Sequence, residues 1–262
     1  MQRETEFKKR MEEIDREIRN RLSRVGKKIA VMSGKGGVGK STVSALLAIH
    51  FAKEGKKVAI FDADFLGPSI PKLFGLDDAK PESSEYGLIP VETKRYRIKV
   101  MSLQFLLPQK EVPVIWRGPL ISGVLRDLLA KTDWEILDYM VFDLPPGTGD
   151  IPITLMQSVQ LDGVIMVASP NELTALIVEK ALNMAKKMEA PVIGIVENMS
   201  YYKCPKCGYV AHIFGERKAK DLAEKYGLKV IAEIPIDPEL AELSDMGEIE
   251  SYEKDYFSDI RI

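Results

Sequence analysis

Short runs of valine and isoleucine alternate with longer segments of helical spacing along most of the chain. Continuous apolar runs are typical of strands buried on both faces, and apolar residues three or four positions apart are typical of helices that cover such a sheet. The pattern therefore predicts an α/β fold of three layers, a mainly parallel β-sheet flanked by helices on both faces. The polar segment 77–97 contains prolines and a glycine, so we expect a loop or hairpin insertion there. The expected strands are 29–32, 58–61, 98–103, 139–142, 164–167, 192–196 and 230–234, and the expected helices are 41–53, 118–131, 173–188, 216–226 and 239–246.

The N-terminal segment has a different pattern. Residues 4–22 are mostly charged and carry a sparse apolar face at helical spacing, formed by Phe7, Met11, Ile14 and Ile18. We expect a charged helix within residues 1–25, which either packs on the body or on a partner, or is simply solvated. The remaining residues, 26–262, are expected to form a single domain.

Composition and charge narrow the classes of function. The 262 residues are 45% hydrophobic and 29% charged, as in soluble globular proteins, and the formal net charge is −2. Because the chain has no basic excess, we expect neither nucleic acid nor an anionic membrane as a partner. No apolar run approaches the roughly 20 residues that span a bilayer, and the charged N-terminus has no apolar signal core. We therefore expect a cytoplasmic protein.

A glycine-rich turn lies between the first expected strand and the helix that follows it. Gly34, Gly39, Lys40 and Ser41 fit the G-x-x-x-x-G-K-[ST] pattern of a phosphate-binding loop. In such a loop, backbone N–H groups surround the phosphates, the lysine reaches the β- and γ-phosphates, and the hydroxyl ligates Mg²⁺. The pattern predicts a P-loop NTPase fold with ATP and Mg²⁺ as cofactors. The expected nucleotide-binding residues here are Gly34, Lys35, Gly36, Gly37, Val38, Gly39, Lys40, Ser41 and Thr42.

Two aspartates follow the second expected strand. Asp62 and Asp64 lie at or just past its end, where ligands bind in open α/β sheets. Alternate positions of an extended segment point to the same side, so both carboxylates can face one site. One carboxylate could order Mg²⁺-bound water while the other orients the attacking water. Capping and turn formation are the alternative uses of these aspartates.

A third aspartate, Asp143, ends the strand expected at 139–142 and resembles a Walker B aspartate, which holds Mg²⁺ through water. Residues 145–149, Pro-Pro-Gly-Thr-Gly, form a stiff and sharply turning segment that suits a switch loop sensing the γ-phosphate. Asp150 is expected to be a helix N-cap rather than a catalyst.

The two cysteines of the chain, Cys204 and Cys207, stand in the segment Cys-Pro-Lys-Cys, so no disulfide framework exists. A complete Zn²⁺ or 4Fe-4S site commonly has four thiolates, and His212 nearby still leaves this site incomplete. Two subunits related by a twofold axis would supply four thiolates, which favours a metal centre that bridges a homodimer. A thioredoxin-type redox pair and a purely structural pair are the alternatives.

The motifs, taken in order, resemble a known family. The second lysine of the loop GKGGVGKS, Lys35, is typical of deviant Walker A ATPases, although it could also be a solvated loop lysine. Together with DADFLGPSIPKLFG, the WRGP of Trp116 to Pro119, LDYMVFDLPPGTGD and ENMSYYKCPKCG, it makes the chain similar to Mrp/ApbC/Nbp-type iron–sulfur cluster carrier ATPases. The likeness covers roughly residues 26–245. Eukaryotic Nbp-type members add an N-terminal cysteine-rich site, and residues 1–28 contain no cysteine.

The resemblance implies an ATP-hydrolysing homodimer that holds a labile 4Fe-4S cluster between its cysteine pairs and transfers it to apo-proteins. The implied partners are a second copy, apo iron–sulfur proteins and cluster-assembly scaffold proteins. Lys35 would act in trans on phosphates bound by the other subunit, Asp64 would activate water, and Asp62 would support the metal shell. Asn198 matches the position that reads adenine, with Pro235 and Asp237 across the base. The implied catalytic residues are Lys35, Lys40 and Asp64, and the implied metal ligands are Ser41, Asp62 and Asp143 for Mg²⁺, partly through water, and Cys204 and Cys207 for the cluster or for Zn²⁺.

The main alternative is a nucleotide-switched dimeric scaffold or regulatory ATPase, similar to Min- or Par-type proteins, with structural Zn²⁺ between the cysteine pairs. A Min-type protein needs a basic amphipathic C-terminal helix, and this chain ends in an acidic segment. A Par-type protein needs basic surface patches, and none is evident. Because Asn198 and Cys204 share one segment, we expect nucleotide to change the spacing or exposure of the cysteines.

Overall fold

The computed structural model describes residues 2–65, 67, 69–106, 118–147, 149–171, 175–187, 189–215, 218–260 and 262. Several positions of the motifs quoted above lie outside these residues, namely Leu66, Pro68, Trp116, Arg117 and Thr148. The same holds for the first two positions of the helix expected at 173–188, for its last position, and for the first two of the helix expected at 216–226.

A large central sheet organises the described part of the chain. Its strands follow the order β10-β9-β8-β1-β7-β2-β6-β5, and β11 also pairs with β9. The pairs are parallel except for β5 with β6 and β9 with β10, and β3 and β4 form a separate antiparallel hairpin. The mainly parallel sheet expected from the sequence is therefore confirmed. The strands are β1 (Val25–Ser33), β2 (Val58–Asp62), β3 (Glu82–Ser84), β4 (Gly87–Ile89), β5 (Val91–Glu92), β6 (Lys99–Ser102), β7 (Leu137–Asp143), β8 (Gly163–Ala168), β9 (Val192–Lys203), β10 (Val210–Ala211) and β11 (Val230–Ile236).

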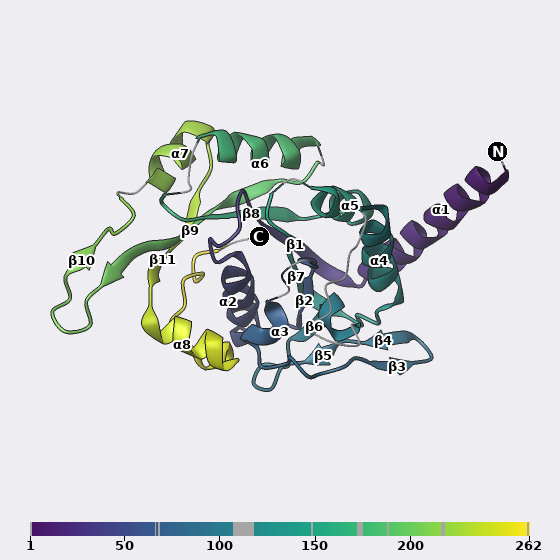
Figure 1. Cartoon of the computed structure of the whole chain (residues 1–262), viewed down its shortest axis with the longest axis horizontal. Helices are drawn as coiled ribbons and strands as arrows, with labels where there is room; N and C mark the ends of the chain where they lie inside the picture. Colours follow the sequence, from purple (N-terminus) through teal and green to yellow (C-terminus); the bar gives the residue numbers. More distant parts are fainter. Residues whose placement is uncertain are drawn as a thin grey trace.

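Helices cover both faces of this sheet. Figure 1 shows α2, α3 and α8 on one side and α5, α6 and α7 on the other. Within the described ranges, no helix is both long and apolar enough to cross a membrane. The helices are α1 (Gln2–Leu22), α2 (Lys40–Lys53), α3 (Ile70–Leu73), α4 (Gly118–Lys131), α5 (Asp150–Ser158), α6 (Ala175–Lys187), α7 (Lys218–Tyr226) and α8 (Pro238–Met246), with 3₁₀ turns η1 (Leu103–Leu106) and η2 (Ile249–Ser251).

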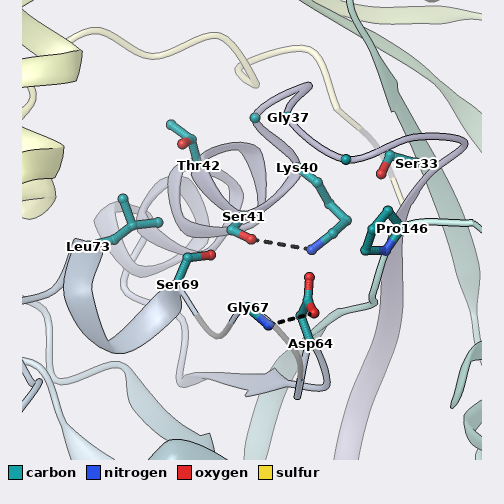
Figure 2. Close-up of a pocket in the computed structure, with 12 residues that line it drawn as sticks. Ser33, Gly37, Lys40, Ser41, Thr42, Asp64, Gly67, Ser69, Leu73 and Pro146 are labelled. Carbon is teal, nitrogen blue, oxygen red and sulfur yellow. Dashed lines mark hydrogen bonds between the residues drawn. The ribbon is translucent and has the colours of Figure 1, made fainter. Parts of the chain in front are cut away.

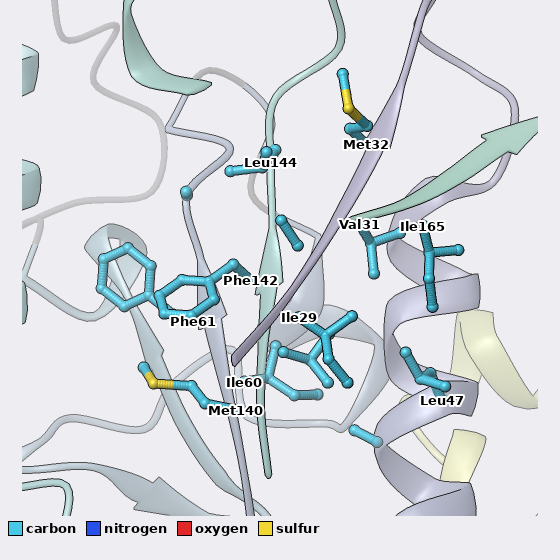
Figure 3. Close-up of a cluster of buried hydrophobic side chains, with 14 of the residues drawn as sticks. Ile29, Val31, Met32, Leu47, Ile60, Phe61, Met140, Phe142, Leu144 and Ile165 are labelled. Atoms are coloured by element: carbon cyan, nitrogen blue, oxygen red, sulfur yellow. The ribbon is translucent and has the colours of Figure 1, made fainter. Parts of the chain in front are cut away.

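The core lies on both faces of the central strands, because their apolar runs send successive side chains to opposite sides. Figure 3 shows Ile29 and Ile60 on the side of Leu47 of α2, and Phe61 and Phe142 on the other side. All five side chains are buried. The rigid strands that result end at one edge of the sheet, where β1, β2 and β7 deliver the residues of the candidate site.

The elements differ from expectation in several places, and α3 and β10 were not expected at all. Helix α5 was not expected as such, because its nine residues include Pro152 and several β-branched side chains that weaken a helical pattern. Its N-cap is Gly149, so the N-cap assignment for Asp150 is wrong by one position; Asp150 is the first helical residue, where its charge still favours the helix dipole. Strand β9 continues to Lys203, well beyond the 192–196 expected from its apolar run.

The N-terminal helix packs on the body by its second half. Ile18 is fully buried, Leu22 is nearly so, and Arg126 of α4 donates to both carboxylate oxygens of Asp15 at 2.7 and 2.8 Å. The first half projects away from the sheet (Figure 1). The C-terminal half of α1 is thus part of the core rather than a solvated appendage.

We expect Ile18→Ala to lower the free energy of unfolding by about 2–5 kcal/mol, because it leaves a cavity between α1 and the body. The exposed neighbour Glu12 provides a control, since Glu12→Ala should change the stability by no more than about 0.5 kcal/mol. Urea denaturation of the three proteins measures both effects. Equal stability of the Ile18 and Glu12 variants would show that α1 does not contribute to the core.

Candidate functional site

The glycine-rich loop connects β1, which ends at Ser33, to α2, which begins at Lys40. It borders a cavity of about 250 Å³ at the edge of the sheet. Figure 2 shows Lys40 and Asp64 pointing into this space from opposite sides. Of the residues expected to bind nucleotide, Gly34, Lys35 and Val38 belong to the loop without lining the cavity. The lining residues are Ser33, Gly36, Gly37, Gly39, Lys40, Ser41, Thr42, Asp64, Gly67, Ser69, Leu73 and Pro146.

The loop needs glycine at two positions, because Gly37 and Gly39 have φ angles of +82° and +78°. Gly39 also lies against Asn198 of β9. A Cβ at Gly39 would meet Asn198 Nδ2 at 2.1 Å, and that amide donates to the Val38 carbonyl oxygen at 2.9 Å. Asn198 is 6% exposed. The structure thus places the expected adenine-reading residue against the backbone of the phosphate loop, where its amide supports the loop.

We expect Gly39→Ala to displace the Asn198 amide and to lower the free energy of unfolding by about 2–4 kcal/mol, with a matching loss of nucleotide affinity. Gly55 is a matched control, because its φ is +79° and a Cβ there would meet nothing within 4 Å. Gly55→Ala should therefore cost only about 1–2 kcal/mol of backbone strain and leave nucleotide affinity unchanged. Thermal unfolding and nucleotide titration would contradict this expectation if the two variants behaved alike.

Four polar side chains form a connected set below the loop. Lys40 Nζ lies 2.7 Å from Asp143 Oδ1, and both side chains are buried. Ser41 Oγ donates to Asp143 Oδ2 at 2.6 Å, and Ser44 Oγ donates to Asp143 Oδ1 at 2.7 Å. The set fixes Asp143 at the end of β7 and directs Lys40 toward it. A phosphate group entering the cavity must compete with this carboxylate for the lysine.

The two aspartates after β2 have different surroundings. Asp62 is fully buried, accepting from Ser102 Oγ at 3.1 Å and from the backbone N–H of Asp64 at 3.1 Å. Burial raises the pKa of Asp62 well above its ordinary value, nearby Asp143 adds to the rise, and Lys40 opposes it. Asp64 is only half-buried, lines the cavity and accepts from the N–H of Gly67 at 3.2 Å. Asp64 is therefore the better placed of the two to meet a ligand directly.

These side chains also fit Mg²⁺. Carboxylates and hydroxyls are the oxygen donors that this ion prefers, and Asp143, Ser41 and Asp62 supply them at one edge of the sheet. Two buried carboxylates near one lysine disfavour the charged form of Asp62, as its raised pKa indicates. A divalent cation held by Asp143, Ser41 and Asp62 would stabilise the charged form of these carboxylates.

The outer part of the loop is tied to the segment after Asp143. Ser33 Oγ donates to the carbonyl oxygen of Lys35 at 3.0 Å, and the N–H of Gly147 donates to the carbonyl oxygen of Ser33 at 2.8 Å. Pro146 from the same segment lines the cavity. Lys35 lies in the exposed part of the loop. The link through Gly147 connects the phosphate loop to the expected switch.

Pro235 and Asp237, which were expected across the adenine base from Asn198, have structural partners of their own. Asp237 is the N-cap of α8, accepting from the N–H of Glu239 at 3.0 Å, from Tyr252 Oη at 2.7 Å and from Lys254. The hydrogen bonds from Lys254 and Tyr252 hold the pKa of Asp237 below its ordinary value despite partial burial. Pro235 lies in β11 opposite an irregular stretch of β9 and lacks the N–H that a ladder needs.

The cysteines lie at the tip of a hairpin formed by the end of β9 and by β10. We call residues 202–211 the cysteine hairpin. The N–H of Cys204 donates to the carbonyl oxygen of Tyr209 at 2.9 Å, and the N–H of Gly208 donates to that of Cys204 at 2.9 Å. Backbone N–H groups of Cys207 and Lys206 point to the Cys204 sulfur and, with the Cys207 side chain, lower the pKa of the Cys204 thiol. The turn therefore favours the thiolate form, which is the form that binds metals.

The cysteine hairpin projects from the body at the opposite end from α1 (Figure 1). Cys207 is exposed and Cys204 is partly so. Within the described residues, no group of three or more histidine, cysteine, aspartate or glutamate side chains is close enough to hold a metal ion. Large apolar side chains around the hairpin are also exposed: Tyr209, Val210, Ile213 and Phe214. The hairpin therefore presents two thiols and an apolar surround to the outside.

Sequence reasoning did not identify two hydroxyls of the site. Ser44 lies one turn after Ser41 on the same face of α2, so helical spacing could have pointed to it. Ser102 reaches Asp62 from the neighbouring strand β6, and no local pattern marks it. Both fix a buried carboxylate rather than line the cavity.

The chain matches the ParA family, described as the NUBPL iron-transfer P-loop NTPase, over residues 24–260. An iron-sulfur cluster carrier protein of Aquifex aeolicus is 48% identical over 221 residues, which are 84% of this chain and 60% of that protein. This chain thus spans less than two thirds of the length of the Aquifex relative. An iron-sulfur cluster carrier protein of Methanocaldococcus jannaschii is 45% identical over 241 residues, 92% of this chain and 83% of that protein.

Solved structures are similar as well. The nucleotide-binding protein of Archaeoglobus fulgidus, in complex with ADP, is 54% identical with a TM-score of 0.87, over 95% of this chain and 97% of that chain. The cell division ATPase MinD of Pyrococcus furiosus has a TM-score of 0.59 at 19% identity, over 86% and 90% of the two chains. The second likeness is one of fold alone.

Proposed function

Since the chain belongs to the ParA family of iron-transfer P-loop NTPases, we propose that it binds and hydrolyses ATP and carries a 4Fe-4S cluster between two copies of itself. Relatives named iron-sulfur cluster carrier proteins support an iron–sulfur cluster as the cargo. The ADP complex of the Archaeoglobus protein supports a nucleotide as the ligand. The cluster is held as cargo and passed to apo-proteins, and cluster-assembly scaffold proteins are the partners that would supply it.

One observation carries this proposal. The cysteine hairpin presents Cys204 and Cys207 outward, and no third potential ligand lies near them in the described chain. A 4Fe-4S cluster commonly takes four thiolates, so two hairpins related by a twofold axis complete the set. The exposed apolar side chains beside the hairpin give such a pair a surface to bury.

The nucleotide site has its own division of roles. Lys40 and the N–H groups of the loop bind the phosphates, and Ser41 and Asp143 hold Mg²⁺, which neutralises phosphate charge when bound. Asp64 lies where it can orient water for attack on the γ-phosphate, giving ADP and phosphate. Lys35, which is exposed in the loop, reaches the phosphates of the other copy. Asn198 reads adenine while supporting Val38, with Pro235 and Asp237 across the base.

A second candidate is a nucleotide-switched dimeric scaffold whose hairpins bind Zn²⁺ structurally. The turn of the cysteine hairpin supports the zinc scaffold as much as the cluster carrier, because backbone N–H groups stabilise the Cys204 thiolate for zinc as well as for iron.

Anaerobic reconstitution with iron and sulfide separates the two candidates. A cluster carrier is expected to gain a broad absorbance band near about 400 nm, about four irons per dimer and the mass of a dimer. The same sample should then transfer its iron to an apo-protein that accepts a 4Fe-4S cluster. Retention of zinc at about one ion per dimer, without iron uptake, would favour the scaffold instead.

A further inference from the structure

We propose that an irregular stretch of β9, residues 197–200, transmits nucleotide binding at the phosphate loop to the cysteine hairpin, with Met199 as the positioning residue. We call this stretch the β9 bulge. The inference rests on the proposed function, because it names the element that links the two sites of one chain. The link is a path of direct contacts, and each contact can be traced in the structure.

The backbone of the bulge is unusual for a strand. Met199 has a φ of +56°, a left-handed conformation that side chains other than glycine, asparagine and aspartate rarely adopt. Pairing with β11 slips at the same place: Ile234 pairs with Asn198 and Ile236 with Tyr202. Strand β9 thus advances four residues where β11 advances two, and Pro235 stands opposite without an N–H to donate. Such strain persists only where the surroundings hold it, and it is concentrated at functional sites.

On one side the bulge contacts the phosphate loop. Asn198 Nδ2 donates to the carbonyl oxygen of Val38 at 2.9 Å, directly before Gly39 and Lys40. A Cβ at Gly39 would lie 3.9 Å from the terminal carbon of Met199, so the Met199 side chain also reaches this loop. A shift of the loop backbone on nucleotide binding therefore acts on two successive residues of β9.

On the other side the bulge contacts the cysteine hairpin. His212, the residue after the hairpin, places its Nδ1 3.3 Å from the carbonyl oxygen of Ser200. The ring of His212 also packs edge-on against Tyr201, with centroids 6.4 Å apart. Both ends of the hairpin are thereby attached to the bulge, one through the chain of β9 and the other through His212.

The bulge is also anchored from below. Glu197 is fully buried, and it accepts from Ser200 Oγ at 2.8 Å and from the N–H of Ala219, in the first turn of α7, at 3.1 Å. Because the Glu197–Ser200 bond spans the bulge, its two ends stay close while the middle adopts the strained conformation. The bulge is held by Glu197, contacts the phosphate loop through Asn198 and continues into the cysteine hairpin. A small movement of the loop can therefore change the positions of Cys204 and Cys207.

The test measures how nucleotide changes thiol reactivity in the protein without iron. The rate of Cys207 alkylation by iodoacetamide is followed by mass spectrometry, with and without a non-hydrolysable ATP analogue and Mg²⁺. We expect the analogue to change the rate at least about fivefold in the unaltered protein, the low end of typical coupling between sites. Met199→Asn should keep that response, because asparagine tolerates the left-handed conformation. Met199→Val should reduce it to less than about twofold, because a β-branched residue does not.

Controls separate the bulge from other causes. Glu189, also on a left-handed backbone at φ +54°, lies just before the other end of β9, so Glu189→Val imposes the same strain and should leave the response intact. If Met199→Val does not fold, Ser200→Ala removes the Glu197 bond instead and should also reduce the response. Nucleotide affinity should stay within about threefold in every folded variant.

Three results would overturn the proposal: no response in the unaltered protein, equal loss in the valine and asparagine variants, or full response in the valine variant. The second of these would mean that the left-handed backbone of the β9 bulge does not carry the link. Failure of the unaltered protein to take up iron would count against the proposed function, and it leaves the thiol measurement standing.

Discussion

Lys35→Ala is expected to lower the rate of ATP hydrolysis at least about a hundredfold while leaving ATP affinity nearly unchanged. A cation supplied in trans to a phosphoryl group typically contributes about 10³–10⁵ in rate, because it offsets charge that develops only in the transition state. Lys35 is exposed and lies outside the cavity lining, whereas Lys40 is buried against Asp143. We therefore expect binding to depend on Lys40 and turnover on Lys35. Phosphate release and nucleotide titration measure the two effects separately.

Mixing two inactive variants tests whether Lys35 acts on the other subunit. A dimer of one Lys35→Ala chain and one Asp64→Asn chain contains one site with an intact Asp64 and a partner lysine. Random mixing makes half of the dimers mixed, with one working site of two, so about a quarter of the original activity should return. Lys56→Ala, a change at an exposed lysine beyond α2, should leave hydrolysis unaltered. No recovery in the mixture would place Lys35 in its own site and remove the need for a dimer in hydrolysis.

The sequence predicted the layered fold because each central strand is a local apolar run that no other structure accommodates as well. The same reasoning failed at the far half of β9, where Glu197 to Lys203 are mostly polar and the strand is broken by the bulge. Those residues are held by contacts from α7, β11 and the phosphate loop, which are distant in sequence. Local patterns do not contain such contacts, so neither the length of β9 nor its irregularity could be predicted.

The candidate site was likewise predictable only where local motifs determine it. The order of the motifs predicted the family, which the match over residues 24–260 confirms, and Lys40, Ser41 and Asp143 lie together as expected of their motifs. The support of Asn198 to Val38 and the burial of Asp62 behind Ser102 depend on packing between elements. Motifs identify the side chains expected to bind or react. The hydroxyl and amide side chains that hold them in place belong to common residue types, which no sequence pattern marks.

Replacing both cysteines by serine is expected to abolish cluster binding, lowering iron after reconstitution from about four per dimer to less than about one. Serine matches the size of cysteine, but its hydroxyl stays protonated at neutral pH and binds iron poorly, so the N–H groups that favour the Cys204 thiolate have no anion to stabilise. Cys204→Ser alone should suffice, because it removes two of the four thiolates from a dimer. Iron, sulfide and oligomer mass are measured together on each variant.

The iron content of these variants shows whether the cluster is bound between the hairpins of two copies or elsewhere in the protein. Lys206→Ser, between the two cysteines on the exposed turn, keeps both thiols and should keep its iron, which separates loss of ligands from disturbance of the hairpin. Nucleotide affinity should be unchanged in all of these variants, since the hairpin lies outside the phosphate cavity. A double serine variant that still bound four irons per dimer would mean that the hairpin is not the cluster site. The exposed apolar side chains around it would then need another explanation.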